Sequence, residues 1–201
     1  MFLLHRPSNR QVEDFVSAQQ HSDFSYSPLE LTRNSPVDGY NVDHNRVQLG
    51  SGAESFSAAV KAIQQWKMFD LGWVRLYSDQ TPIETGATVA IVVNHLGFWS
   101  MNACRIVYVI DEDARYGFAY GTLTEHAERG EERFLVEWNR DDDSVWYDIF
   151  ALSKPGPMAK LAYPLTRRLQ KRFAADSKQA MKRALQGSSP QTRSTQPNRR
   201  R

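Results

Sequence analysis

The stretch 115–138, RYGFAYGTLTEHAERGEERFLVEW, places the strongest constraint on the fold of this 201-residue chain. Large aromatic side chains alternate with small ones through its first half: Tyr116, Gly117, Phe118, Ala119, Tyr120 and Gly121. A period of two is typical of β-strands, so the stretch predicts two antiparallel strands joined by a polar loop. The small face of the first strand would let another element, or a ligand, approach the sheet backbone closely.

The same period of two continues on both sides of this stretch. It predicts strands at 73–77, 88–93, 103–110, 116–123, 132–139 and 144–152, with a further short strand at 45–49. Short segments containing Asp, Asn, Gly and Pro separate most of them, and such links join antiparallel strands. The sequence therefore predicts a meander of about seven antiparallel strands rather than a parallel α/β sheet.

Helical patterns lie between and after the strands. Ser51 and Glu54 have the spacing of a capping box, and apolar residues at helical spacing then predict a helix to about Phe69. A long amphipathic helix is predicted from Met158 to about residue 185. It either kinks at Pro164 or begins its main part there, because proline suits the first turn of a helix.

This order of elements predicts an α+β protein with a helix-grip fold, in which a curved antiparallel sheet wraps a long C-terminal helix. Residues 41–185 would form that domain. Residues 1–40 would be an N-terminal extension with a short helix at 11–20, and residues 186–201 a disordered basic tail. A cavity between sheet and helix is common in this arrangement.

The charge is divided unevenly along the chain. Residues 1–156 carry 13 basic and 22 acidic residues, whereas residues 157–201 carry 12 basic and one acidic. The basic helix face, with Arg167, Arg168, Lys171 and Arg172, could neutralise nucleic-acid phosphates. The alternative is a solvated face balanced by the acidic sheet, and the tail lacks the aromatic residues that would stack on single strands.

The sequence favours a cytoplasmic protein. Cys104 is the only cysteine, so an internal disulfide is excluded, and its predicted role is that of a buried small hydrophobe rather than a nucleophile. No apolar run is long enough to span a bilayer, and the N-terminus lacks the pattern of a secretory signal. Motifs of common hydrolases, nucleotide-binding loops and zinc sites are missing, so we expect neither cofactor nor metal.

Several side chains are candidates to line a ligand cavity. Aromatic and charged residues of the predicted strands and their tips make up this set: His95, Trp99, Arg105, Tyr108, Tyr120, Trp138 and Tyr147. Such rings and polar groups suit an apolar or aromatic ligand that makes a few hydrogen bonds. The alternatives are that the aromatic residues fill the core, that His95 belongs to a turn, and that Arg105 is solvated.

Histidine and carboxylate chemistry gives a second hypothesis. His126 lies among four glutamates, where it could act as a general base or metal ligand, although a solvated hairpin loop would look the same. An enzyme using the cavity could instead take His95, or a tyrosine and a glutamate, as acid and base. No catalytic residue is assigned, and the sequence leans towards a binding protein.

Three segments resemble a known family. CRIVYVIDEDARYGFAYGTLTEHAERGEERFLVEW, SVWYDIFALSKP and LAYPLTRRLQKRF, together with the earlier GSGAESFSAAVKAIQQWKMF, are similar to the uncharacterised DUF1990 family over about residues 40–185. That family is placed among START-like helix-grip proteins, so the resemblance implies the fold. It implies no established reaction or ligand, and it therefore supplies no catalytic residues.

Overall fold

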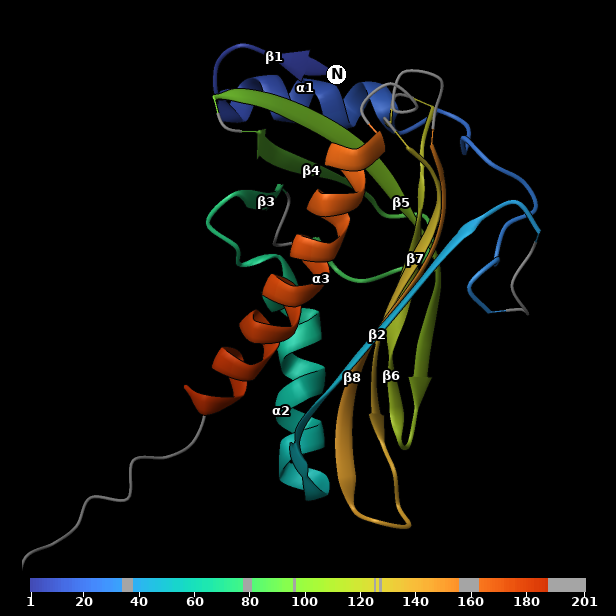
Figure 1. Ribbon diagram of the computed structural model, residues 1–201, viewed down its shortest axis with the longest axis vertical. Helices are drawn as coiled ribbons and strands as arrows, with labels where there is room; N and C mark the ends of the chain where they lie inside the picture. Colours follow the sequence, from blue (N-terminus) through green and yellow to red (C-terminus); the bar gives the residue numbers. More distant parts are fainter. Residues whose placement is uncertain are drawn as a thin grey trace, which may run out of the picture.

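The computed structural model of the protein describes residues 1–33, 38–77, 81–95, 97–124, 126, 128–155 and 163–187. In this part of the chain an antiparallel sheet curls around a long helix (Figure 1). The sheet runs in the order β2-β8-β7-β6-β5-β4-β3, and β1 pairs with β5 beside that path. The strands are β1 Phe2–Leu3, β2 Asn41–Ser51, β3 Val74–Tyr77, β4 Thr88–His95, β5 Phe98–Glu112, β6 Arg115–Thr122, β7 Glu128–Trp138 and β8 Ser144–Pro155.

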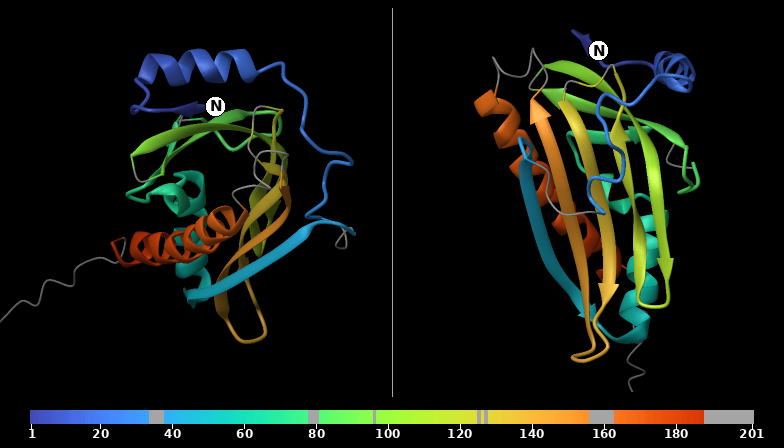
Figure 2. Two further views of the ribbon diagram at one scale, coloured as in Figure 1. Left: turned by 45° about the horizontal axis from the view of Figure 1, so that its top comes forward. Right: turned by 90° about the vertical axis from the view of Figure 1, so that its right-hand side faces the viewer.

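The helices divide between the two faces of the sheet. α2 (Gly52–Gln64), the 3-10 turn η1 (Lys67–Phe69) and α3 (Tyr163–Gln186) lie inside the curl, whereas α1 (Asn9–Gln19) lies outside it (Figure 2). No helix in the described ranges is long and apolar enough to cross a membrane. This arrangement confirms the predicted α+β class and helix-grip architecture.

The main core fills the concave face. Alternate residues of β6 and β7 point into it, and Phe118 and Phe134 are fully buried with ring centroids 5.4 Å apart. Trp66, which directly precedes η1, packs edge-on against Phe118 with ring centroids 4.9 Å apart. Burial of such large rings gives roughly 1.5–3 kcal/mol each, so this aromatic cluster is a main contributor to the fold.

The small face of β6 lies on the convex side, where the N-terminal segment covers it. A Cβ atom at Gly121 would lie 2.2 Å from the Tyr26 hydroxyl oxygen, so only glycine allows this approach. Tyr26 then donates a 2.7 Å hydrogen bond to the buried Glu131. The sequence left open whether another element or a ligand approaches the small face of β6. In the structure it is an element of the chain, the N-terminal segment with Tyr26.

The local signals at the helix ends were only partly correct. Ser51 does precede α2, but its side chain makes no capping hydrogen bond, and the residue pairs with Ser144 at the end of β2. A capping box forms instead at Ser8 and Gln11 of α1. α3 begins at Tyr163, which places Pro164 in the first turn, as the second alternative predicted. The predicted helical residues 158–162 and tail residues 188–201 lie outside the described ranges.

A β-bulge divides β5 into two parts of opposite side-chain phase. Ile106 pairs with Tyr120, but Tyr108 pairs with the adjacent Ala119. Residues before the bulge with even numbers face the concave core, whereas Tyr108 beyond it faces outwards. The extra residue increases local twist, which lets one long strand serve both halves of the curled sheet.

Candidate ligand-binding cavity

A cavity of about 310 Å³ lies between the first half of α3 and the concave face of the sheet. Its position follows from the curl of the sheet. The curl holds α3 away from β4 and β5, while η1 and α2 fill the rest of the concave face (Figure 1). The wall is mainly apolar, with these side chains: Phe69, Trp73, Val74, Ile91, Val93, Ile149, Leu165, Leu169, Phe173 and Ala174. Size and lining match those of small-molecule sites in proteins.

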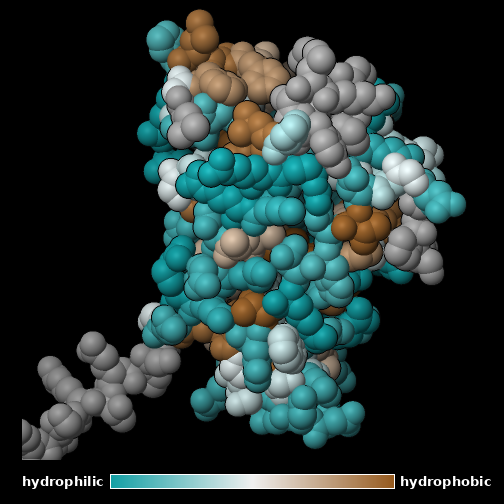
Figure 3. Space-filling view, in the orientation of Figure 1, coloured by the Kyte–Doolittle hydropathy of each residue, from teal (hydrophilic) through white to brown (hydrophobic). Residues whose placement is uncertain are grey.

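Exposed apolar side chains flank the mouth. Phe2, Phe98 and Leu165 line the cavity, and each keeps between 39% and 53% of its surface exposed. The hydrophobic surface at the top of Figure 3 lies over β1 and contrasts with the hydrophilic surface along α3. The cavity thus opens beside an apolar rim.

A tyrosine–glutamate pair lies inside the cavity. Tyr120 of β6 and Glu132 of β7 are directly opposite one another, and the tyrosine O–H donates to Glu132 Oε2 at 2.7 Å. The pKa of Glu132 is raised to about 7, mainly by burial and also by the nearby carboxylates of Glu128 and Asp43, against the opposing effect of the Tyr120 hydrogen bond. Burial also raises the pKa of Tyr120. Glu132 therefore exchanges its proton near neutral pH.

A second polar group joins the sheet to α3. Gln170 donates through Nε2 to both oxygens of Glu128, at 2.7 and 2.9 Å, and Arg167 forms an ion pair with Asp43 of β2. Burial raises the pKa of Glu128. These contacts fix the N-terminal half of α3 over the cavity.

His95 lies on the opposite wall. Its Nε2 is 2.8 Å from Ser100 Oγ, which accepts a 3.0 Å hydrogen bond from the Asn102 amide. The ring stacks on Phe98 with centroids 5.0 Å apart, and burial lowers its pKa. His95 and Tyr120 are the two members of the predicted set that line the cavity.

Trp99, Arg105 and Tyr108 lie on the convex side, which corrects their predicted place in the cavity. Trp99 packs into the cluster beneath α1, on the face of β5 opposite to Phe98. Arg105 donates to the carbonyl oxygens of Gln19, Gln20 and Ser22 at 2.7–2.9 Å, which closes the C-terminal end of α1. Tyr108 bonds to Thr32, because the bulge reverses its side.

Trp138 and Tyr147 face the concave core but lie apart from the cavity. Trp138 packs on Phe56 of α2 with centroids 5.9 Å apart, near the β7–β8 turn. Tyr147 is fully buried and its hydroxyl is 2.9 Å from Ser177 Oγ of α3. Their position corrects the prediction, since both fill the core, which was the alternative for the aromatic residues.

His126 belongs to the loop between β6 and β7. Its Nδ1 accepts a 3.0 Å hydrogen bond from the Glu128 amide, and burial lowers the pKa of the ring to about 4. Among the described residues no group of three or more histidine, cysteine or acidic side chains is arranged to hold a metal ion. Cys104 is fully buried, and burial raises the pKa of its thiol, consistent with a core role.

The predicted basic face of α3 is partly engaged within the protein. Arg167 pairs with Asp43, and Arg172 pairs with Asp176 while its guanidinium lies 4.5 Å from the centre of the Trp73 ring. Arg168 and Lys171 are exposed, and Lys171 reaches the cavity edge. The ion pair between Arg167 of α3 and Asp43 of the sheet agrees with the alternative in which this helix face is solvated and balanced by sheet carboxylates.

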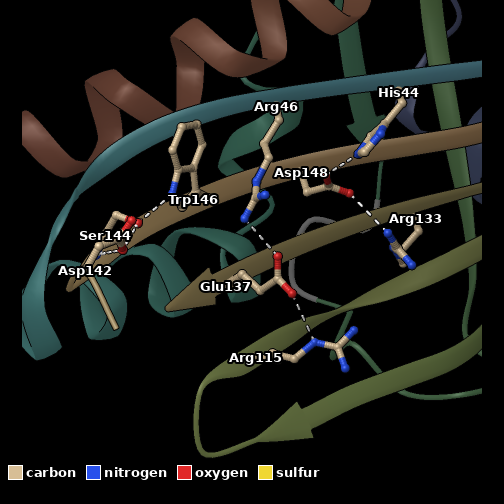
Figure 4. A network of polar contacts seen from close by, with 9 residues as sticks. All are labelled: His44, Arg46, Arg115, Arg133, Glu137, Asp142, Ser144, Trp146 and Asp148. Carbon is tan, nitrogen blue, oxygen red and sulfur yellow. Dashed lines mark hydrogen bonds and ion pairs between the residues drawn. The ribbon is translucent and has the colours of Figure 1, made fainter. Parts of the chain in front are cut away.

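The outer face of β2, β6, β7 and β8 carries a polar network (Figure 4). The buried carboxylate of Asp148 is 3.1 Å from the Arg133 guanidinium and 2.5 Å from Nε2 of the exposed His44. Arg46 and Arg115 both pair with Glu137. This network lies on the side of the sheet opposite to the cavity and crosses four strands, so we assign it a structural role.

The fold and the cavity define a helix-grip protein with an apolar internal site. Two solved structures are similar to this chain in fold alone. Norcoclaurine synthase from Thalictrum flavum has a TM-score of 0.50 and 13% sequence identity, and the match covers 75% of this chain and 97% of that chain. The di-domain ARO/CYC StfQ from the steffimycin biosynthetic pathway has a TM-score of 0.51 and 9% identity, and the match covers 74% of this chain and 51% of that chain.

The sequence comparison identifies the family. A family model described as "Domain of unknown function (DUF1990)" matches residues 25–180. UPF0548 proteins of Dictyostelium discoideum and Arabidopsis thaliana are 37% and 34% identical, covering 92% and 88% of this chain and 96% and 93% of theirs. The chain belongs to this uncharacterised family, as its motifs predicted.

Proposed function

We propose that the protein is a cytoplasmic binding protein for a small, largely apolar molecule held between α3 and the concave face of the sheet. The observation that carries this proposal is the cavity of about 310 Å³ with a mainly aromatic and aliphatic wall. Close packing is the rule in protein interiors, so a space of this size with a mainly apolar surface favours an occupant.

The polar groups of the cavity would orient a bound ligand, and they leave the space between the walls open to it. Tyr120 and Glu132 stand on one wall, and His95 with Ser100 on another. An apolar body would gain about 25 cal/mol for each Å² of surface removed from water, and a single polar group could reach either wall. This favours a ligand with one apolar part and few polar atoms.

A fluorescence titration tests the proposal. N-phenyl-1-naphthylamine is a neutral aromatic probe whose emission rises in apolar surroundings, and we expect saturable binding to the full chain. Ala174→Phe on α3 places a ring in the cavity and should weaken binding at least tenfold, because Ala174 is buried against it. Ala175→Phe, one position along the same helix but exposed, is the matched control and should bind as wild type.

The outcome that would contradict the proposal is equal binding by the two variants, or no binding by the wild type. Ala151→Leu, a smaller filling from β8, provides a second variant if Ala174→Phe fails to fold. Circular dichroism and the unfolding midpoint identify a variant that has lost its structure.

General acid–base catalysis in the same cavity is a second candidate. It is favoured by one observation, the 2.7 Å contact between Tyr120 and Glu132, whose carboxyl has a pKa raised to about 7. A group with this pKa can give or take a proton near neutral pH. Conversion of a bound compound by the wild type, and not by Glu132→Gln, would support catalysis, whereas unchanged recovery of the compound from both would contradict it.

A further inference from the structure

We propose that Glu132 recognises a cationic nitrogen on the ligand, so that the cavity selects an apolar molecule carrying one amine over neutral or acidic molecules of the same shape. This inference rests on the proposed function, because it names the ligand class of that same cavity.

The hydrogen bonding of Glu132 leaves one oxygen available. Oε2 accepts the Tyr120 hydroxyl, and no hydrogen bond or ion pair to Oε1 is present among the described residues. The side chain lines the cavity and comes from the concave face of β7. Since Tyr120 donates to this carboxylate, an ammonium group could bind the second oxygen without displacing the tyrosine.

The charges around Glu132 also favour a cation. Asp43 on β2 and Glu128 on β7 raise its pKa by repulsion, so they are close enough to interact. The cations on the facing helix are Arg167, which pairs with Asp43, and Lys171, which is exposed at the cavity edge. The wall containing Glu132 therefore carries three carboxylates, the paired guanidinium of Arg167 and the exposed Arg129 of β7.

The histidines near the cavity add no competing positive charge at neutral pH. His95 on β4 and His126 in the β6–β7 loop both have pKa values lowered by burial. Cys104 on β5 and Tyr147 on β8 have pKa values raised by burial, so they stay neutral. A ligand ammonium would supply the missing counter-charge, and burial of an unpaired anion is costly.

The apolar lining supports the rest of the ligand. Phe69 and Phe173 lie beside the tyrosine–glutamate wall, with Phe69 6.2 Å from Tyr120 and 5.5 Å from Phe173 between ring centroids. These rings offer a surface to an aromatic or aliphatic body. An ammonium next to them would also gain from their negative ring faces.

Three matched probes test the inference in the full-length protein. Tryptamine, tryptophol and indole-3-propionate share an indole and a two-carbon chain, and end in an ammonium, a hydroxyl and a carboxylate. Calorimetric titration at pH 8 should show tryptamine binding at least tenfold more tightly than tryptophol, and indole-3-propionate most weakly. Glu132→Gln should remove the preference for tryptamine while leaving the affinity for tryptophol within about twofold.

A control variant and the dependence on pH distinguish a specific effect of the Glu132 carboxylate from a general effect of the protein's charge. Glu84→Gln alters an exposed glutamate away from the cavity and should leave all three affinities unchanged. Between pH 6 and pH 8 the affinity for tryptamine should rise about fivefold or more, because Glu132 must lose its proton. The affinity for tryptophol should change little over this range.

The outcomes distinguish the inference from the proposed function. Equal affinities for tryptamine and tryptophol, or a preference that survives in Glu132→Gln, would overturn the inference and leave a general apolar binding site. Absence of binding by all three probes, together with absence of N-phenyl-1-naphthylamine binding, would overturn both. Tryptamine preference that depends on Glu132 and increases with pH would establish the ligand class.

Discussion

Tyr120 and Glu132 face each other across β6 and β7, joined by a 2.7 Å hydrogen bond inside the cavity that α3 covers. The alternation of aromatic and small residues along β6 thus also puts Tyr120 on the face of the strand that lines the cavity. Burial holds the carboxyl of Glu132 near the midpoint of its titration at neutral pH, so we expect this pair to make the stability of the protein, and the ligand preference proposed above, depend on pH.

Glu132→Gln should stabilise the protein at alkaline pH. The pKa of Glu132 rises from an ordinary value of 4.5 to about 7 on folding, so the folded state holds this proton more tightly than the unfolded state. Its contribution is therefore most favourable below pH 4.5 and is lost as pH rises through 7. Urea unfolding at pH 8 should give the variant an advantage of about 1–3 kcal/mol, which disappears near pH 4.

Glu84→Gln serves as the control in the same experiment, because its side chain is exposed. An equal advantage for both variants, or an advantage of Glu132→Gln that is independent of pH, would show that the charge of Glu132 is not the cause.

Tyr120→Phe should raise the pKa of Glu132 further. The tyrosine hydroxyl donates to the carboxylate and so favours its ionised form, and the variant loses this donor while keeping the ring. Carbon NMR of the glutamate carboxyl groups, with the Glu132 signal assigned by its loss in Glu132→Gln, measures the change. A pKa that falls or stays constant would contradict the described hydrogen bond.

Gly121→Ala should destabilise the protein by about 1–3 kcal/mol through overpacking. A Cβ atom at this position would lie 2.2 Å from the hydroxyl oxygen of Tyr26, which is buried and bonded to Glu131. The same substitution in a Tyr26→Ala background should cost less than about 1 kcal/mol, because the clash is gone. Additive costs in a double-mutant cycle would contradict this packing.

Arg105→Met should loosen α1 without changing ligand binding. The guanidinium donates to three carbonyl oxygens at the end of that helix, on the convex side of the sheet. Hydrogen exchange should therefore accelerate in residues 9–22 and stay slow in β7 and β8. Weaker binding of N-phenyl-1-naphthylamine with unchanged exchange in α1 would instead place Arg105 in the cavity.

The sequence predicted the architecture because hydrophobic periodicity reports which face of each element is buried. The alternation of large and small residues in β6 placed Phe118 on the face with the large side chains, and Phe118 and its strand partner Phe134 are both fully buried. The spacing along α3 identified the helix that the sheet wraps. These signals depend on many residues at once, so errors at single positions do not alter them.

The pairing of Tyr120 with Glu132 could not be read with the same certainty, because it depends on the centre of one turn. In the structure, strand residues at equal distances before and after His126 face each other, and Tyr120 and Glu132 each lie six positions from it. The strands predicted at 116–123 and 132–139 would centre their connection between residues 127 and 128, which gives another register. A glycine near a strand end marks either a turn or a bulge, and Gly130 lies within β7.

The bulge in β5 explains the error at Tyr108, and local packing explains those at Trp99 and Arg105. A single extra residue between Ile106 and Tyr108 reverses the side of all later residues of the strand. The choice of face for Trp99 and Arg105 depended on the N-terminal segment, whose α1 and following turn pack on the convex side. Contacts between such distant segments have no periodic signal.

Native mass spectrometry of the purified full-length protein tests the central claim most directly. We expect a mass excess over the denatured chain that corresponds to one small molecule per protein, and that is lost in Ala174→Phe but retained in Ala175→Phe. Identification of the released compound would then show whether it joins an apolar body to an amine. A wild-type protein that carries no such compound and also binds none of the aromatic probes would contradict a ligand-binding role for the cavity.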